Sequence, residues 1–107
     1  MTRADIQRGV QQVVKQVVSL ARPQRVILFG SAVEGRVGPD SDLDFLAVVP
    51  DGRDIRQVTD HLNVGVRGRL MPCDFVVVTP SILRKHRHKP GMVYGEILNH
   101  GREVYAG

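Results

Sequence analysis

Three short apolar runs most constrain what this chain can fold into, because each has the length of a buried strand rather than of a helix. They lie at residues 25–30, 42–49 and 73–78. Each run is apolar on both faces, so helices should cover both sides of the sheet that the runs form. We therefore predict an α/β (α+β) fold, a mixed β-sheet covered by helices, in a single domain over residues 1–107.

The segments around the runs have helical periodicity. Apolar residues recur at helical spacing over residues 1–21, where Thr2 and Asp5 have capping-box spacing and Arg22-Pro23 ends the helix. A second helix is expected from Ile55 to Val66. Helical structure should then restart at residues 79–81, break at 90–91, resume over 92–99 and precede a short strand at 102–105.

The lengths of the connections predict how the strands pair. Only eleven residues, 31–41, join the first run to the second. That is about the minimum for a parallel crossover, so we expect an antiparallel pair, with one helical turn beginning at Ser31. The second and third runs are separated by a helix, and a strand–helix–strand unit implies a right-handed parallel crossover. The end of the first run should therefore lie beside the starts of the other two.

Polar residues occupy that meeting point. Gly30 and Ser31 begin a turn whose backbone N–H groups can face an anion. Asp42 and Asp44 start the second run and project on one side of it, with Cα atoms roughly 7 Å apart. Asp74 should arrive beside them, and a carboxylate buried in so apolar a run would need a metal, a cation or hydrogen-bond donors. Together these residues predict a nucleotide and divalent-metal site. The alternatives are ordinary polar residues at a strand start and, for Asp74, a buried arginine partner.

The order Gly30-Ser31, a ten-residue gap, Asp42-Leu43-Asp44 and later Asp74 resembles the signature of the minimal nucleotidyltransferases (MNT) of the DNA polymerase beta-like superfamily. The resemblance implies the polymerase beta-like nucleotidyltransferase fold and transfer of a nucleoside monophosphate, AMP from ATP or another NTP, to a hydroxyl. It implies that the three aspartates are catalytic and bind two Mg²⁺ ions, and that Gly30 and Ser31 bind the nucleotide. The loop departs from the family pattern, because Glu34 precedes its first arginine, Arg36.

The resemblance also implies a partner protein. Minimal members of the family pair with small helical HEPN ribonuclease toxins in toxin–antitoxin modules. The acceptor would then be a hydroxyl of a HEPN-type toxin, typically of a tyrosine, and this chain would be the antitoxin. That reading agrees with our expectation that the chain has no segment of its own to hold an acceptor. Two other classes stay open: a non-catalytic antitoxin that acts by binding, and a stand-alone transferase acting on a small molecule or RNA.

Charge and composition narrow the partners and the compartment. A net charge of +4 and a pI near 9.8 favour an anionic partner, which a nucleotide, a nucleic acid or an acidic protein would satisfy. The basic run at residues 84–89 is either a solvated helix end or a site for nucleic acid or an acidic partner.

The single cysteine, Cys73, fits a small buried hydrophobe in a reducing cytoplasm. With neither a signal peptide nor an apolar stretch of about 20 residues, we expect a cytoplasmic protein without membrane contact. The sequence leaves an oligomer open.

Overall fold

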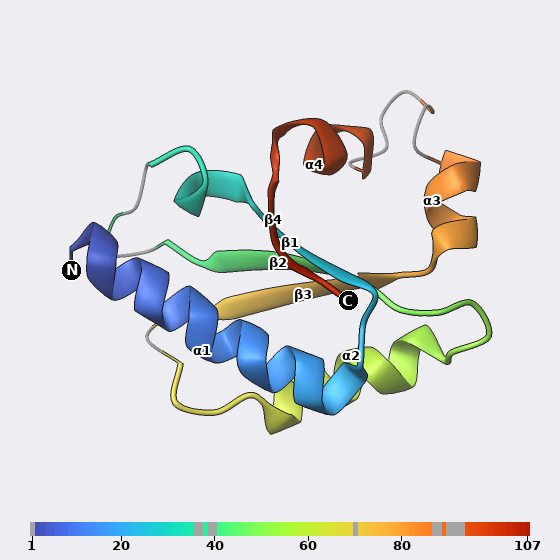
Figure 1. The fold of residues 1–107 in the computed structure, drawn as a ribbon, viewed down its shortest axis with the longest axis horizontal. Helices are drawn as coiled ribbons and strands as arrows, with labels where there is room; N and C mark the ends of the chain where they lie inside the picture. Colours follow the sequence, from blue (N-terminus) through green and yellow to red (C-terminus); the bar gives the residue numbers. More distant parts are fainter. Residues whose placement is uncertain (1, 36–37, 39–40, 70, 87–88, 90–93) are drawn as a thin grey trace.

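The computed structural model has one mixed sheet of four strands in the order β3–β2–β1–β4 (Figure 1). It describes residues 2–35, 38, 41–69, 71–86, 89 and 94–107. The elements are α1 (Arg3–Ala21), β1 (Arg25–Phe29), the 3-10 helix η1 (Gly30–Ala32), β2 (Leu43–Val48), α2 (Ile55–Gly65), β3 (Cys73–Val78), α3 (Pro80–His86), α4 (Tyr94–His100) and β4 (Arg102–Ala106). The fold class predicted from the sequence is confirmed.

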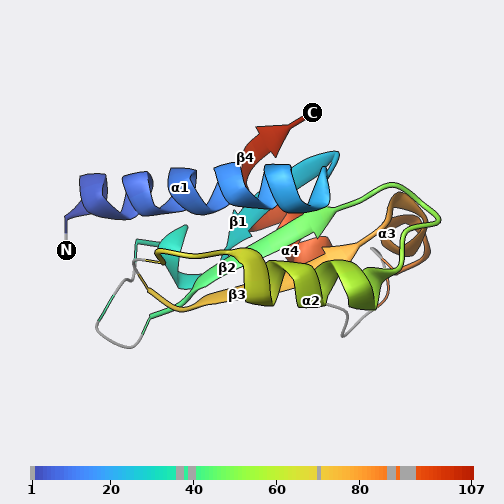
Figure 2. The ribbon, with the colours of Figure 1, turned by 90° about the horizontal axis from the view of Figure 1, so that it is seen from below.

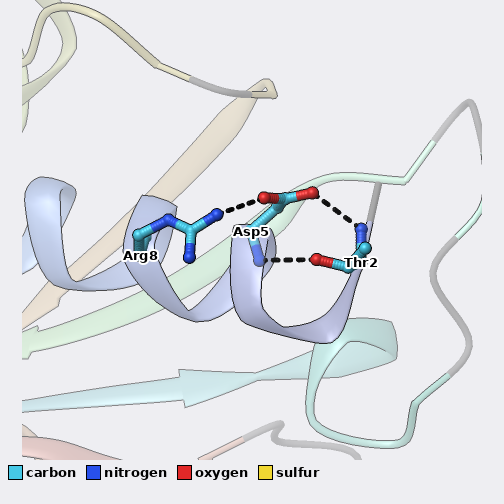
Figure 3. Close-up of polar contacts among 3 residues, drawn as sticks. All are labelled: Thr2, Asp5 and Arg8. Atoms are coloured by element: carbon cyan, nitrogen blue, oxygen red, sulfur yellow. Dashed lines mark hydrogen bonds and ion pairs between the residues drawn. The ribbon is translucent and has the colours of Figure 1, made fainter.

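Helix α1 begins and ends as its local sequence predicts. The Thr2 hydroxyl accepts a hydrogen bond from the Asp5 backbone N–H, and the Asp5 carboxylate accepts one from the Thr2 N–H, which completes the capping box (Figure 3). Arg8 forms a further ion pair with Asp5. At the other end Arg22 adopts a left-handed conformation with φ 47°, and its N–H donates to the carbonyl of Val18.

The strand pairing follows the prediction. Strand β1 is antiparallel to β2, and β2 is parallel to β3. Strand β4 adds to the other side of β1 in an antiparallel sense, so it forms one edge of the sheet. The starts of β2 and β3 therefore lie at the end of β1, as the connection lengths indicate.

Two strand boundaries differ from the prediction next to the candidate site. Gly30, expected as the last residue of the first strand, instead begins η1, because its φ of +82° turns the backbone out of the strand. Asp42, expected inside the second strand, directly precedes it, because the pairing with β3 starts at Leu43. Gly30 therefore directly follows β1, and Asp42 directly precedes β2, so both residues lie just outside the strands.

The sheet separates two hydrophobic clusters. Helices α1 and α2 pack with alternate residues of the strands, including Leu28, Phe45 and Phe75, in the larger cluster. Helices α3 and α4 pack on the opposite face with Ile27 and Leu46 in the smaller one (Figure 2). The prediction of helices on both faces is confirmed, and no helix in the described ranges is long and apolar enough to cross a membrane.

Several predictions concern residues outside the described ranges. These are Arg36, Arg87 and His88, the break at 90–91, and the first two residues of the helix expected over 92–99.

Candidate active site

The end of β1 and the starts of β2 and β3 meet at one edge of the sheet. Phe29 pairs with Asp44 across the antiparallel ladder, and Asp44 pairs with Asp74 across the parallel one. Gly30 follows Phe29 directly, and Asp42 lies two residues before Asp44. The structure thus brings Asp44, Asp74 and the Gly30 turn together, as the sequence predicts.

Asp44 and Asp74 belong to the sheet face that carries the smaller cluster. Side chains alternate along a strand, and Asp44 is two residues before Leu46, a member of that cluster. Its neighbour Phe45 belongs to the larger cluster on the other face. The carboxylates therefore lie on the side of the sheet covered by α3 and α4.

The Asp44 carboxylate occupies the space that a side chain at Gly30 would need. The backbone of Gly30 has φ +82°, where side chains other than hydrogen are strained, and a Cβ at this position would collide with Oδ2 of Asp44. Both the left-handed backbone and the nearby carboxylate therefore favour glycine at this position. The sequence indicated close approach to phosphate, but it gave no signal that the Asp44 carboxylate fills the same space.

Ser31 is the second residue of the short turn that leaves β1. The N–H groups of Val33 and Glu34 donate to the carbonyl of Gly30 at 3.2 and 3.4 Å, which closes η1. The helical turn expected at Ser31 is present and begins one residue earlier. Ser31 is half-buried, and its role toward a nucleotide stays a prediction.

Burial and like charge both act on Asp44. Its half-buried position raises the pKa of the Asp44 carboxyl above the usual range, and the negative charges of Asp74 and then Asp42 raise this pKa further. Within the described residues, no arginine or lysine forms an ion pair with these three carboxylates. A cation bound here would relieve the repulsion.

Asp74 differs from the prediction in one respect. The argument that its apolar strand would bury it is wrong, because Asp74 is exposed to solvent at the start of β3. The buried-arginine alternative is therefore excluded for the described residues. An exposed carboxylate at this edge is accessible to a ligand.

The chemistry of the donor set fits a hard divalent cation, since Mg²⁺ binds carboxylate oxygens and keeps several waters. As the side chains lie, however, no group of three or more Asp, Glu, His or Cys residues in the described ranges is positioned to hold a metal ion.

Cys73 is not a candidate ligand, because it is buried on the opposite face from Asp74 and burial raises the pKa of its thiol. Its predicted packing role is confirmed.

The basic run of residues 84–89 lies at the end of α3. Arg84 donates to Ser81 Oγ and lies 3.9 Å from Asp51, so part of its charge is engaged locally. Burial, with the charges of Lys89 and Lys85, lowers the pKa of His86, whose ring lies 6.4 Å from that of Tyr94. The described part of this run therefore mixes solvated and locally paired cations.

Comparison with known proteins supports the same fold. The model of a family described as nucleotidyltransferase domain matches residues 10–104. A candidate nucleotidyltransferase from Sulfolobus solfataricus superimposes with a TM-score of 0.64 at 19% identity, over 97% of this chain and 83% of that one. A toxin–antitoxin structure determined with AMP-PNP superimposes with a TM-score of 0.59 at 17% identity, over 91% of this chain and 73% of that one. No sequence match to a curated protein was found.

Proposed function

The chain belongs to the nucleotidyltransferase domain family, and from this we propose that it transfers AMP from ATP to a hydroxyl of a partner protein. In this proposal the chain is a minimal nucleotidyltransferase antitoxin, and the partner is a HEPN-type ribonuclease toxin that the modification silences. The observation that carries the proposal is the pairing of Asp44 with Asp74, directly beside the turn at Gly30.

Asp42, Asp44 and Asp74 are the residues that would hold magnesium. When bound, two Mg²⁺ ions neutralise the triphosphate and stabilise the charge that develops on the attacking and leaving oxygens. The raised pKa of Asp44 makes the proton a competitor of the cation at this carboxylate. Gly30 and Ser31 would bind the phosphates from the turn that follows β1.

The reaction forms one bond and breaks one. The acceptor hydroxyl oxygen bonds to the α-phosphorus of ATP, the bond from that phosphorus to the bridging oxygen breaks, and pyrophosphate leaves. The hydroxyl proton passes to a carboxylate within reach of the acceptor. Asp74 is the residue we assign to that role, since it is exposed at the edge where an acceptor would approach.

One comparison supports a protein acceptor. A structure with a similar fold is a toxin–antitoxin structure determined with AMP-PNP, an analogue of ATP. The net charge of +4 is a feature of a different kind, because it favours an anionic partner of any class.

The test is transfer of label from ATP labelled on its α-phosphate, in the presence of Mg²⁺, to the protein encoded by the neighbouring gene. We expect labelling by the wild-type chain, loss of labelling with Asp44→Asn, and retention with Asp60→Asn, the same change at an exposed position on α2. Full neutralisation of the partner by Asp44→Asn without label would instead identify a non-catalytic antitoxin. Label found only on RNA or a small molecule would identify a stand-alone transferase.

A further inference from the structure

A groove of about 540 Å³ runs between α1 and the edge strand β4. Its apolar lining is formed by five side chains, from the buried face of α1 and from the last residues of the chain: Val10, Val14, Val18, Val104 and Tyr105. All of them belong to the larger hydrophobic cluster or pack against it. The groove is therefore a place where the main core reaches the surface.

The groove lies at the open edge of the sheet. Strand β4 pairs with β1 alone among the described strands, and no helix other than α1 contributes to the groove lining. The backbone edge and the apolar lining are thus both available to another chain.

The charged groups of the groove have one sign. Lys15 on α1 and Arg102 on β4 line it, together with Gln7 and Gln11, and none of its lining residues is acidic. Glu103, the acidic residue of β4, forms an ion pair with Arg25 at 2.6 Å instead. The groove thus combines an apolar floor with a positive rim, which is complementary to an apolar segment flanked by carboxylates.

The charge of the chain disfavours a second copy as the occupant. Each copy carries +4 overall, so self-association would bring like charges together at a rim that is already basic. An acidic protein partner meets both requirements of the groove at once.

We propose that the α1–β4 groove docks an acidic amphipathic segment of the partner protein, with its apolar side chains on the valines and Tyr105 and its carboxylates at Lys15 and Arg102. This inference rests on the proposed function for the identity of the partner, which is the acceptor protein. The groove anchors that partner and does not hold the acceptor hydroxyl, because it lies on the opposite sheet face from Asp44 and Asp74.

The position of Arg102 shows how far the groove extends toward the three aspartates. Arg102 pairs with Leu28, the residue before Phe29, and Phe29 pairs with Asp44. One end of the groove therefore lies at the same end of the sheet as the carboxylates. A partner anchored there would be held beside the site while its acceptor reaches the other face.

The experiment measures the dissociation constant between the full-length chain and the protein encoded by the neighbouring gene. We expect Lys15→Glu and Arg102→Glu each to weaken binding about tenfold or more. Gln11→Trp, which fills the groove from an exposed position without a charge change, should weaken binding similarly. Arg56→Glu on the exposed face of α2 is the matched control and should bind as wild type. Thermal unfolding verifies that each variant is folded.

Transfer of label, measured in parallel, separates the two proposals. Asp44→Asn should lose transfer and keep binding, whereas the groove variants should be weakened in both. Label on the partner with unchanged affinity in all groove variants would overturn the docking site and leave the function standing. Binding that depends on the groove, without any label on the partner, would support the docking site and overturn the proposed function. If the wild-type chain alone forms a dimer that Gln11→Trp dissociates, a second copy occupies the groove and the proposal is wrong. If the wild-type chain forms no complex with the partner but labels it, the docking site is wrong and the function stands; if it neither binds nor labels the partner, both proposals are wrong.

Discussion

Replacing Gly30 by alanine tests whether the contact between this residue and Asp44 matters for activity. At φ +82° an alanine carries left-handed backbone strain of roughly 1–2 kcal/mol. Its methyl group would in addition collide with Oδ2 of Asp44, so the carboxylate must move. A misplacement of about 1 Å in a catalytic group can lower the rate about 100-fold. We expect Gly30→Ala to lose transfer by about that factor.

Gly52 provides a control that also has a positive φ but lacks the collision. Its φ is +93°, and an added Cβ meets no atom within 4 Å. It lies in the turn that follows β2, at the opposite end of the sheet from Asp44. Gly52→Ala should therefore have a similar loss of stability and unchanged transfer. Each kcal/mol lowers the Tm by about 4–8 °C in a domain of about this size.

The assay combines thermal unfolding with transfer of labelled AMP, measured well below the Tm of both variants. Isothermal titration with AMP-PNP and Mg²⁺ distinguishes a loss of nucleotide binding from a loss of turnover. Wild-type transfer by folded Gly30→Ala would refute the argument, because it would show that the position of Asp44 tolerates the methyl group. Equal loss of transfer in Gly52→Ala would also refute it, since strain alone would then explain the defect.

Three further predictions concern stability. Because the folded state raises the pKa of Asp44, the ionised carboxylate opposes folding above its usual pKa, and this cost disappears as the pH falls below that range. Asp44→Asn should therefore unfold at a higher temperature than wild type at pH 7.5, with a difference that shrinks toward pH 3; an unchanged difference would contradict the linkage. Thr2→Ala removes the hydroxyl that accepts from Asp5 and should cost about 1 kcal/mol in urea unfolding, whereas no loss would show that the cap is dispensable. Gly101→Ala would place a Cβ 2.5 Å from the carbonyl oxygen of Ile97, and overpacking of this kind costs roughly 1–3 kcal/mol. A wild-type Tm for that variant would mean that α4 shifts freely on β1.

The features predictable from the sequence are those set by local rules. The capping box of Thr2 and Asp5 depends on spacing within one helix turn, and the structure has it. The parallel pairing that places Asp74 beside Asp44 follows from connection length and handedness, so it too could be predicted. The catalytic and metal-binding roles of these residues stay predictions.

What could not be predicted depends on distances between segments. The exposure of Asp74 could not be predicted, because an apolar strand sequence does not show which of its positions the helices leave uncovered; Cys73 beside it is buried. The collision at Gly30 depends on a backbone dihedral and on a side chain from another strand. The α1–β4 groove likewise depends on how far one helix covers the sheet edge.

The unequal clusters on the two faces of the sheet have a consequence for how the protein fluctuates. The larger cluster packs α1 and α2 against the sheet. The smaller cluster packs α3 and α4 against the other face of the sheet, which carries Asp44 and Asp74. Subglobal opening should therefore begin at α3 and α4, whose amides should exchange with solvent at a lower free energy than those of β1 and β2. Helices α3 and α4 can then open locally, and can accumulate substitutions, while the larger cluster on the opposite face keeps the chain folded.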